Sequence, residues 1–453
     1  MDVKGKRVIV IGMARAGMSA IELLMKEGAD VVGVDVKEEG MLEGADWLRE
    51  RGVKVVGGGY SEEMLDGVDM VVKSPGVEMT DNLVSEALKR GIMVIDELEL
   101  AYNNLKTDEV IAVTGTNGKS TTVSLIGHIL NVAGFKAFTA GNIGDPLSAH
   151  ADEEAQFAVV EVSTFQLEAI ERFKPRIGIL LNITPDHLIR HKEMENYIDL
   201  KFRLFDNQMR DEYAILNMDD AIVWDRKGRV KSQVLPFTRG LLEGDGAWVD
   251  DGFIKVSIYS KPVEIIDTEE ISLKGPHNLE NCLASALACF IAGADVEKIA
   301  EGIKTFRGLP HRMEYVCSIN NISFYNDSKA TNPASMEMAL RSFEGDIVLI
   351  AGGIDKGVDF SHLRGLVSEK VRVMVLLGEA REKMAKAFNS TTKLVFSESM
   401  EEAVEKAFEE SQGSGVVLLS PGCASFDMFT DFEDRGERFK RAVRLLNRSY
   451  GGS

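Results

Sequence analysis

The segment from Val110 to Thr122, VIAVTGTNGKSTT, constrains the fold of this chain more than any other. Residues 110–113 are apolar and β-branched, which is typical of a buried strand. Residues 120–133 have helical spacing, and one face of that helix would carry Leu125, Ile126, Ile129 and Leu130. A strand that leads through a glycine-containing loop directly into a helix predicts an α/β domain with a phosphate-binding loop.

The loop itself carries residue types that bind nucleotide phosphates. The N–H groups at the start of a helix are unpaired and favour anions, and Gly115 and Gly118 allow the main chain to approach phosphate oxygens. We expect Lys119 to reach the β and γ phosphates and the Ser120 hydroxyl to bind magnesium. The common pattern would place its first glycine at Val113, so this loop is a TGTNGKS variant. It predicts a nucleoside triphosphate site.

Composition narrows the choice of partners and compartment. The chain has 52 basic and 72 acidic residues and a net charge of −20, which argues against a nucleic-acid partner. Its four cysteines lack the paired spacing of a metal site and indicate reduced thiols. There is no charged-then-apolar leader, and no apolar run approaches the roughly 18 residues of a membrane span. We therefore expect a cytoplasmic protein without membrane contact, and 453 residues predict about three domains.

The first block, residues 1–97, alternates strands with helical stretches, which indicates a parallel sheet covered by helices. The expected strands span residues 7–11, 30–35, 53–56, 69–73 and 93–95. The turn from Gly12 to Gly17 resembles a dinucleotide-binding turn with Ala14 as its middle residue, and Asp35 follows 18 residues after Gly17. Asp35 could accept hydrogen bonds from a ribose or a base, but such a turn also serves simply to pack a strand against a helix.

The second block, residues 98–308, places polar side chains at the ends of two more apolar strands. Residues 157–162 contain one acid, Glu161, where a magnesium ligand would lie beside the phosphate loop. The alternative is a solvated acid at a strand end. Residues 177–184 deliver Asp186 and His187 from their carboxyl end, where open α/β sheets bind ligands.

Two later segments of this block are less regular. Residues 217–274 are rich in glycine and acid and indicate peripheral, hairpin-like β structure without chemistry of its own. The motif His277-Asn278-x-x-Asn281 is expected to open a helix over residues 282–292, with both amides exposed. These amides could bond a purine or cap the helix.

The third block, residues 309–453, alternates again. Strands are expected near residues 322–326, 347–351, 374–377 and 416–419. Polar loops follow three of them, at residues 326–333, 352–357 and 420–427. Because the carboxyl ends of parallel strands share one edge of a sheet, we expect these loops to converge, although each alone could be ordinary turn chemistry.

Several motifs follow one order along the whole chain: TGTNGKST, the strand with Glu161, Asp186-His187, His277 to Asn281, LPHR at 309–312, NDSKATN at 326–332 and SPGCAS at 420–425. In this order they resemble the ATP-dependent Mur ligases of peptidoglycan synthesis. Ser74-Pro75-Gly76 and the Ser425 loop resemble the branch of that family that adds D-glutamate. The resemblance implies a three-domain α/β fold: a Rossmann-like domain for the UDP-linked substrate (1–97), a central P-loop-type ATP-binding domain with a parallel sheet (98–308) and a Rossmann-like domain for the incoming amino acid (309–453).

The resemblance also implies a reaction. D-glutamate would be joined to UDP-N-acetylmuramoyl-L-alanine through an acyl phosphate, with ATP and two magnesium ions as cofactors, in a protein that acts as a monomer. Ser120 and Glu161 would bind the first magnesium, and His187 and a carbamylated Lys201 the second. From the residues alone, Lys201 is instead a solvated helix lysine.

The remaining roles follow from the same resemblance. Lys329 would lie next to the reaction centre, alongside the catalytic positions Lys119, Glu161, His187 and Lys201. The ATP-binding positions would be Gly115, Thr116, Asn117, Gly118, Lys119, Ser120, Thr121, Asn278, Asn281, Arg312 and Asp327. The UDP-linked substrate would be held by Asp35, Lys37, Ser74, Gly76, Asn142 and His187. The amino acid would be held by Thr331, Lys356, Ser425 and the main chain near Phe432.

Three other functions compete with this interpretation. A NAD-linked oxidoreductase would use the turn at Gly12 with Asp35 but leaves the phosphate loop unexplained. A P-loop switch protein would hydrolyse ATP without a muramoyl nucleotide. A folylpolyglutamate-type ligase would share the central domain and the acyl phosphate but consume a pteridine-glutamate.

Overall fold

The computed structural model describes all residues except 143–144, 187, 260, 274, 356 and 451–453. The chain forms two compact units, and each is described by itself. Unit 1 contains residues 1–271 and 277–306, and unit 2 contains residues 272–276 and 307–453. No helix among the described residues is both long and apolar enough to cross a membrane.

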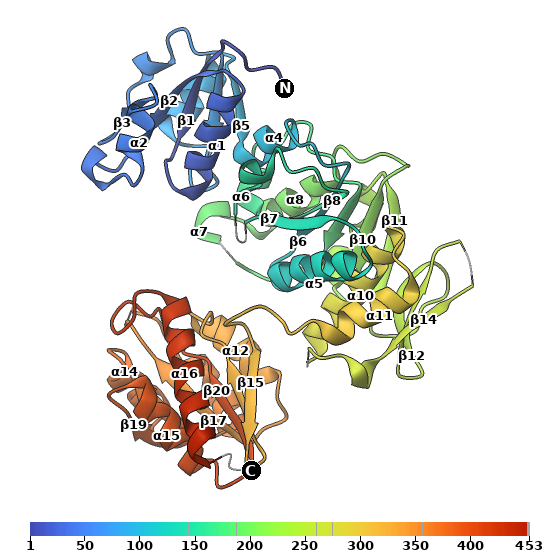
Figure 1. Ribbon diagram of the computed structural model, residues 1–453, viewed down its shortest axis with the longest axis vertical. Helices are drawn as coiled ribbons and strands as arrows, with labels where there is room; N and C mark the ends of the chain where they lie inside the picture. The colour runs from blue at the N-terminus through green and yellow to red at the C-terminus, as the bar shows by residue number, and fades with distance from the viewer. Residues whose placement is uncertain (143–144, 187, 260, 274, 356, 451–453) are drawn as a thin grey trace. The chain divides into compact units, whose positions relative to one another are not determined.

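The N-terminal sheet of unit 1, drawn in blue in Figure 1, has five parallel strands, and their order is β3-β2-β1-β4-β5. Its strands are β1 (Arg7–Ile11), β2 (Asp30–Val34), β3 (Lys54–Val56), β4 (Met70–Lys73) and β5 (Met93–Asp96). Its helices are α1 (Arg15–Lys26), α2 (Ala45–Arg49) and α3 (Asn82–Lys89), and α4 (Glu97–Tyr102) follows β5 directly. The strands are almost entirely buried, as expected for a parallel sheet covered on both faces.

The central sheet of unit 1 has nine strands in the order β14-β13-β12-β11-β10-β9-β6-β8-β7. They are β6 (Glu109–Thr114), β7 (Ala137–Gly141), β8 (Phe157–Glu161), β9 (Ile177–Leu180), β10 (Tyr213–Asn217), β11 (Gln233–Thr238), β12 (Gly246–Asp250), β13 (Phe253–Ser257) and β14 (Val263–Asp267). The helices are α5 (Lys119–Val132), α6 (Thr164–Leu167), α7 (Leu188–His191), α8 (Met194–Phe202), α9 (Ala221–Trp224), α10 (Pro276–Ile291) and α11 (Val296–Thr305).

The expectation of hairpin-like structure over residues 217–274 was partly wrong. Strand β11 runs parallel to β10 and continues the central sheet, and β12 is in turn parallel to β11. Only β12, β13 and β14 form an antiparallel meander, at the edge of the sheet. Pro236 in β11 is typical of an edge strand, because proline cannot donate a hydrogen bond to a neighbouring strand. In the structure β12 pairs with β11 only at Phe237 and Thr238, after this proline.

Unit 2 contains a six-stranded sheet in the order β15-β16-β20-β17-β18-β19, parallel except for β15. The strands are β15 (Glu314–Ile319), β16 (Ile322–Asn326), β17 (Ile347–Gly352), β18 (Val371–Leu377), β19 (Lys393–Phe396) and β20 (Gly415–Leu419). The helices are α12 (Pro333–Arg341), α13 (Arg364–Lys370), α14 (Arg381–Phe388), α15 (Met400–Glu410) and α16 (Phe432–Tyr450). Because β16, β20 and β17 are neighbours, the three polar loops that follow them do emerge at one edge.

Candidate active site

The phosphate loop has the geometry that its sequence predicts. It connects β6, which ends at Thr114, to α5, which begins at Lys119. Gly115 and Gly118 have φ angles of 153° and 86°, which residues other than glycine rarely adopt. A Cβ atom on Gly118 would lie 2.4 Å from Oδ1 of Asn281. The loop is therefore built for glycine, and it leads into the start of a 14-residue helix, where main-chain N–H groups favour an anion.

The loop is held in place by the ends of neighbouring strands. The amide of Asn117 donates to Oδ1 of Asn182 at 2.8 Å, and the Thr116 hydroxyl donates to the carbonyl of Thr184 at 3.1 Å. Lys119 lies across the loop, where its Nζ donates to the carbonyls of Gly115 (2.8 Å) and Thr116 (2.9 Å). These contacts preorganise the loop before any phosphate binds.

Ser120 and Glu161 lie together at the ends of adjacent elements. The Ser120 hydroxyl donates to Oε2 of Glu161 at 2.6 Å, and Nδ2 of Asn142 donates to Oε1 at 2.8 Å. Hydroxyl and carboxylate oxygens are the hard ligands that magnesium prefers, so this pair fits the ion. Among the described residues there is no cluster of three His, Cys, Asp or Glu side chains suited to a metal. Magnesium here would keep water and phosphate oxygens in its shell, as it usually does in nucleotide sites.

Lys201 is not the solvated lysine that its helical position suggests. Its side chain is buried in α8, and Nζ lies 4.6 Å from the centre of the Tyr197 ring. Burial, reinforced by the positive charge of Lys119, lowers the pKa of Lys201 well below its ordinary value. Tyr197 in turn lies 3.1 Å from the Thr116 hydroxyl, so Lys201 lies close to the phosphate loop. His187, which was predicted to act with Lys201, lies outside the described residues.

Asn278 and Asn281 are buried, not exposed as the sequence suggested; α10 begins earlier than expected, at Pro276, and includes both residues. Nδ2 of Asn281 donates to Oδ1 of Asn278 at 3.2 Å, and Oδ1 of Asn281 accepts from the Thr122 hydroxyl, also at 3.2 Å. Thr121 lies beside Thr122 in the first turn of α5. Both amides therefore lie beside the phosphate loop.

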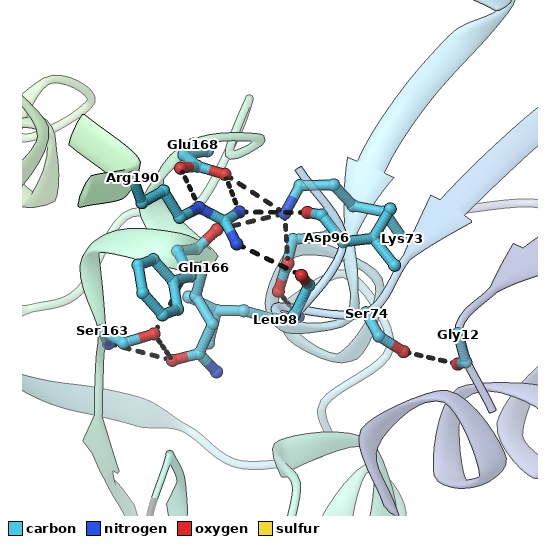
Figure 2. Close-up of polar contacts among 12 residues, drawn as sticks. Gly12, Lys73, Ser74, Asp96, Leu98, Ser163, Gln166, Glu168 and Arg190 are labelled. Atoms are coloured by element: carbon cyan, nitrogen blue, oxygen red, sulfur yellow. Dashed lines mark hydrogen bonds and ion pairs between the residues drawn. The ribbon is translucent and has the colours of Figure 1, made fainter. Parts of the chain in front are cut away.

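The residues predicted for the UDP-linked substrate lie at the carboxyl edge of the N-terminal sheet. The Asp35 carboxylate accepts from the amides of Met13 (2.7 Å) and Lys37 (2.9 Å), so it fixes the turn after β1. The Ser74 hydroxyl donates to the carbonyl of Gly12 at 2.6 Å (Figure 2). The structure thus brings the Gly12 turn, Asp35 and the Ser74 loop together, whereas Asn142 lies with Glu161 in the central domain.

Sequence analysis missed a group of four charged side chains, Lys73, Asp96, Glu168 and Arg190, which we call the charged cluster (Figure 2). Lys73 and Asp96 are fully buried, and Nζ of Lys73 lies 3.2 Å from Oδ2 of Asp96 and 3.6 Å from Oε2 of Glu168. Arg190 binds both carboxylate oxygens of Glu168, at 3.1 and 2.6 Å. The available signal was the charged residue Lys73 at the end of an apolar strand, immediately before Ser74-Pro75-Gly76.

In unit 2, the loops after β16 and β20 are joined by buried polar contacts. The Asp327 carboxylate accepts from the Ser420 hydroxyl (3.0 Å) and the Met313 amide (3.1 Å), and burial raises its pKa to about 7. The guanidinium of Arg435 is 1% exposed and donates to the Ser328 hydroxyl (2.8 Å), the Ser328 carbonyl (2.7 Å) and the Cys423 carbonyl (2.9 Å). Sequence analysis did not identify Arg435, although it lies on the same face of α16 as the buried residues Phe439, Val443 and Leu446.

The other predicted residues of unit 2 surround these loops. Nζ of Lys329 lies 5.5 Å from the centre of the Phe432 ring, and the carbonyl of Phe432 accepts from the Ser328 hydroxyl at 2.8 Å. Ser425 is buried, and Thr331 lines a cavity of about 10 Å³ with Cys423, which is room for about one water. Arg312 is half-buried and lies two residues before the start of β15. Lys356 lies outside the described residues.

A glycine-lysine-serine loop after one parallel strand, with a carboxylate at the end of the neighbouring strand, defines a P-loop nucleotide-binding protein. Comparison with known families narrows this class. Residues 6–96 match the Mur ligase MurD-like N-terminal domain, residues 113–289 the Mur ligase middle domain, and residues 311–423 the Mur ligase glutamate ligase domain. The chain belongs to the Mur ligase family, which confirms the resemblance seen in the sequence and the three-domain α/β fold.

Individual relatives cover the whole chain. A UDP-N-acetylmuramoylalanine–D-glutamate ligase of Thermoanaerobacter sp. (strain X514) is 42% identical over 99% of this chain and 100% of the relative. An enzyme of the same name from Geobacter metallireducens is 43% identical over 98% of this chain and 99% of its own length. Among solved structures, the UDP-N-acetylmuramate–alanine ligase MurC of Thermotoga maritima has a TM-score of 0.59 at 20% identity, covering 98% of this chain and 99% of that one. This last similarity concerns the fold alone.

Proposed function

We propose that this protein is the ATP-dependent ligase that adds D-glutamate to UDP-N-acetylmuramoyl-L-alanine in peptidoglycan synthesis. The observation that carries the proposal is identity of 42–43% to relatives with this activity in their names, over 98–99% of this chain. The Ser120–Glu161 pair beside a preformed phosphate loop supports the ATP-dependent part of the reaction.

The chemistry explains why such a site is needed. A carboxylate is a poor electrophile, so the alanine carboxylate of the nucleotide substrate first takes the γ-phosphoryl group of ATP, giving an acyl phosphate and ADP. The amine of D-glutamate then attacks the acyl carbon, and phosphate leaves as the amide forms. Because both phosphoryl-transfer partners are anions, positioning and charge neutralisation dominate catalysis. Lys119 and the N-terminus of α5 would supply part of that neutralisation.

For the metal ions, we propose Ser120 and Glu161 as ligands of a first magnesium, and His187 with carbamylated Lys201 as ligands of a second. Bound magnesium would screen the charge on the phosphate oxygens. The lowered pKa of Lys201 supports the carbamate, since only the unprotonated amine reacts with CO₂. In that reaction the neutral amine nitrogen bonds to the carbon of CO₂ and one proton is released, so a neutral amine becomes an anionic carbamate. Growth or dialysis in ¹³C-bicarbonate should give a carbamate carbon signal that Lys201→Ala lacks.

We propose that each of the three domains supplies a different set of substrate-binding residues. Residues 1–97 would hold the UDP-linked substrate through Asp35, Lys37, Ser74 and Gly76, with Asn142 from the central domain. Residues 98–308 would hold ATP through the phosphate loop, Asn278 and Asn281. Residues 309–453 would add Arg312 and Asp327 to the nucleotide site and bind D-glutamate through Thr331, Lys356, Ser425 and the main chain near Phe432, with Lys329 beside the reacting atoms. We further propose that the protein acts as a monomer in the cytoplasm, and its four unpaired cysteines support that compartment.

The test is phosphate release from ATP with UDP-N-acetylmuramoyl-L-alanine and one of four additions: D-glutamate, L-glutamate, D-lysine or no amino acid. We expect release that depends on both the nucleotide substrate and D-glutamate. Equal release under all four conditions would contradict the assignment of the amino acid. Trapping the acyl phosphate with borohydride should yield the corresponding alcohol, and its absence during product formation would contradict the intermediate.

A further inference from the structure

The charged cluster lies where the N-terminal domain meets the central domain of unit 1. Lys73 and Asp96 are the last residues of β4 and β5 in the N-terminal sheet, whereas Glu168 and Arg190 belong to the central domain. The cluster contains two cations and two anions, so its charges balance. Such balance is needed, because removing one partner from a buried ion pair leaves the other charge uncompensated.

On the N-terminal side of the cluster, Lys73 contacts the segment that follows Glu161. Besides its hydrogen bond to Asp96 and its ion pair with Glu168, Nζ of Lys73 donates to the carbonyl of Phe165 at 3.2 Å. That segment is itself rigid, since Ser163 and Gln166 form a reciprocal capping box at the start of α6. Lys73 therefore connects the strand before Ser74 to a fixed point four residues beyond Glu161.

From the central side, Arg190 reaches back to the loop after Ser74. Its Nη1 donates to the carbonyl of Gly76 at 3.2 Å and its Nη2 to that of Val77 at 3.0 Å. The same guanidinium stacks on the Phe165 ring, with 4.2 Å to the ring centre, and is held by Glu168. One side chain thus joins two backbone carbonyls of the loop to the central domain.

We propose that the charged cluster positions the nucleotide substrate: it fixes the loop of Ser74 and Gly76 relative to Glu161, so that the bound substrate's carboxylate is presented to the phosphate loop. Arg190 is the central positioning residue, because it alone of the four contacts the loop after Ser74 directly. This inference rests on the proposed function, since it assumes that the loop holds the UDP-linked substrate.

The kinetic test uses Arg190→Lys, with Arg203→Lys as a matched control. Arg203 also donates to backbone carbonyls of this segment, those of Glu168 (2.7 Å) and Ile170 (2.9 Å), but forms no hydrogen bond or ion pair with the described residues 74–77. Lysine keeps the charge but lacks the planar guanidinium fork that reaches Glu168 and the two carbonyls from one side chain. Hydrogen bonds that involve a charged group stabilise more than neutral ones do. We therefore expect the KM for UDP-N-acetylmuramoyl-L-alanine to rise about tenfold or more in Arg190→Lys. The KM for ATP should change by less than about threefold in both variants.

A second measurement does not depend on activity. Amide hydrogen exchange of a peptide covering residues 74–79 should be faster in Arg190→Lys than in the wild type, and unchanged in Arg203→Lys. Glu168→Gln, which keeps the shape of the side chain but removes its charge, should reproduce a weaker form of the Arg190→Lys result. It also provides a test if Arg190→Lys does not fold.

The outcomes separate the two proposals. A wild type that makes no product from the muramoyl nucleotide and D-glutamate contradicts the proposed function, whatever the exchange data show. Unchanged exchange at residues 74–79 in both Arg190→Lys and Glu168→Gln, or equal effects of Arg190→Lys and Arg203→Lys on the two KM values, overturns the positioning role even if the wild type is active.

Discussion

Glu97 provides a quantitative test of the electrostatics in unit 1. Its side chain is 1% exposed at the start of α4, Oε1 accepts from the Ser148 amide at 2.7 Å, and Oε2 has no partner among the described residues. Burial raises the pKa of Glu97 from 4.5 to about 7. Below pH 4.5 the residue is protonated in both folded and unfolded chains and has no effect. As the pH rises towards 7, the unfolded chain ionises first, so the folded state loses about 3 kcal/mol of stability.

The substitution Glu97→Gln should remove this pH dependence, because glutamine keeps the acceptor for Ser148 and has no proton to lose. Unfolding in urea can be followed by tryptophan fluorescence, since Trp47, Trp224 and Trp248 all lie in unit 1. Between pH 4.5 and 7.5 the variant should gain about 3 kcal/mol in unfolding free energy relative to the wild type. The exposed Glu62→Gln serves as control. Parallel stability curves for Glu97→Gln and the wild type would refute the argument.

Four further substitutions test the two units. Gly118→Ala should lower the unfolding free energy of unit 1 by at least about 1–2 kcal/mol, because residue 118 has a left-handed backbone. A smaller loss when the same substitution is made in Asn281→Ala would show that contact between the new Cβ atom and Asn281 contributes to the loss. Lys119→Ala should lower phosphate release by at least about a hundredfold. Lys201→Ala should be inactive in the same assay and partly rescued by a small carboxylic acid, and failure of rescue would count against the carbamate. Arg435→Met should lower the unfolding free energy of unit 2, because it leaves the carbonyls of Ser328 and Cys423 without this donor, and should raise the KM for the amino acid about tenfold as the link between the two loops is lost. An unchanged KM would contradict that link.

Most of the sheet framework could be predicted because it depends on local apolar runs. The strands predicted at residues 7–11 and 322–326 agree with β1 and β16 at both ends. Strand β7 (AFTAG) was missed, since small and polar residues at a sheet edge have no clear β pattern. The phosphate loop was predictable for the same local reason: its strand, glycines and helix are contiguous in sequence.

Burial of charge was the property that sequence could not show. Lys201 was expected to be solvated because lysine usually is, but it shares a helical face with Tyr197 and Ile198, and that face packs into the core of the central domain. The sequence pattern predicts Asn278 and Asn281 as exposed because it concerns only their own helix, whereas in the structure both are buried and Asn281 contacts Thr122 of α5. A periodic pattern reports which face of an element is apolar, not which polar residue on another face meets a second element.

The charged cluster could not be predicted either, because its partners lie far apart in the sequence. The hydrogen-bonding partners of Lys73 are 23 and 92 residues away, and those of Arg190 include a carbonyl 114 residues away. A lysine at the end of an apolar strand would ordinarily extend its charge to water, and here it is buried only because acids and a carbonyl from two domains surround it. Its burial therefore depends on the docking of the two domains. Any shift that separated them would leave buried charges without partners, which is why this junction is suited to hold the loop after Ser74 in one position.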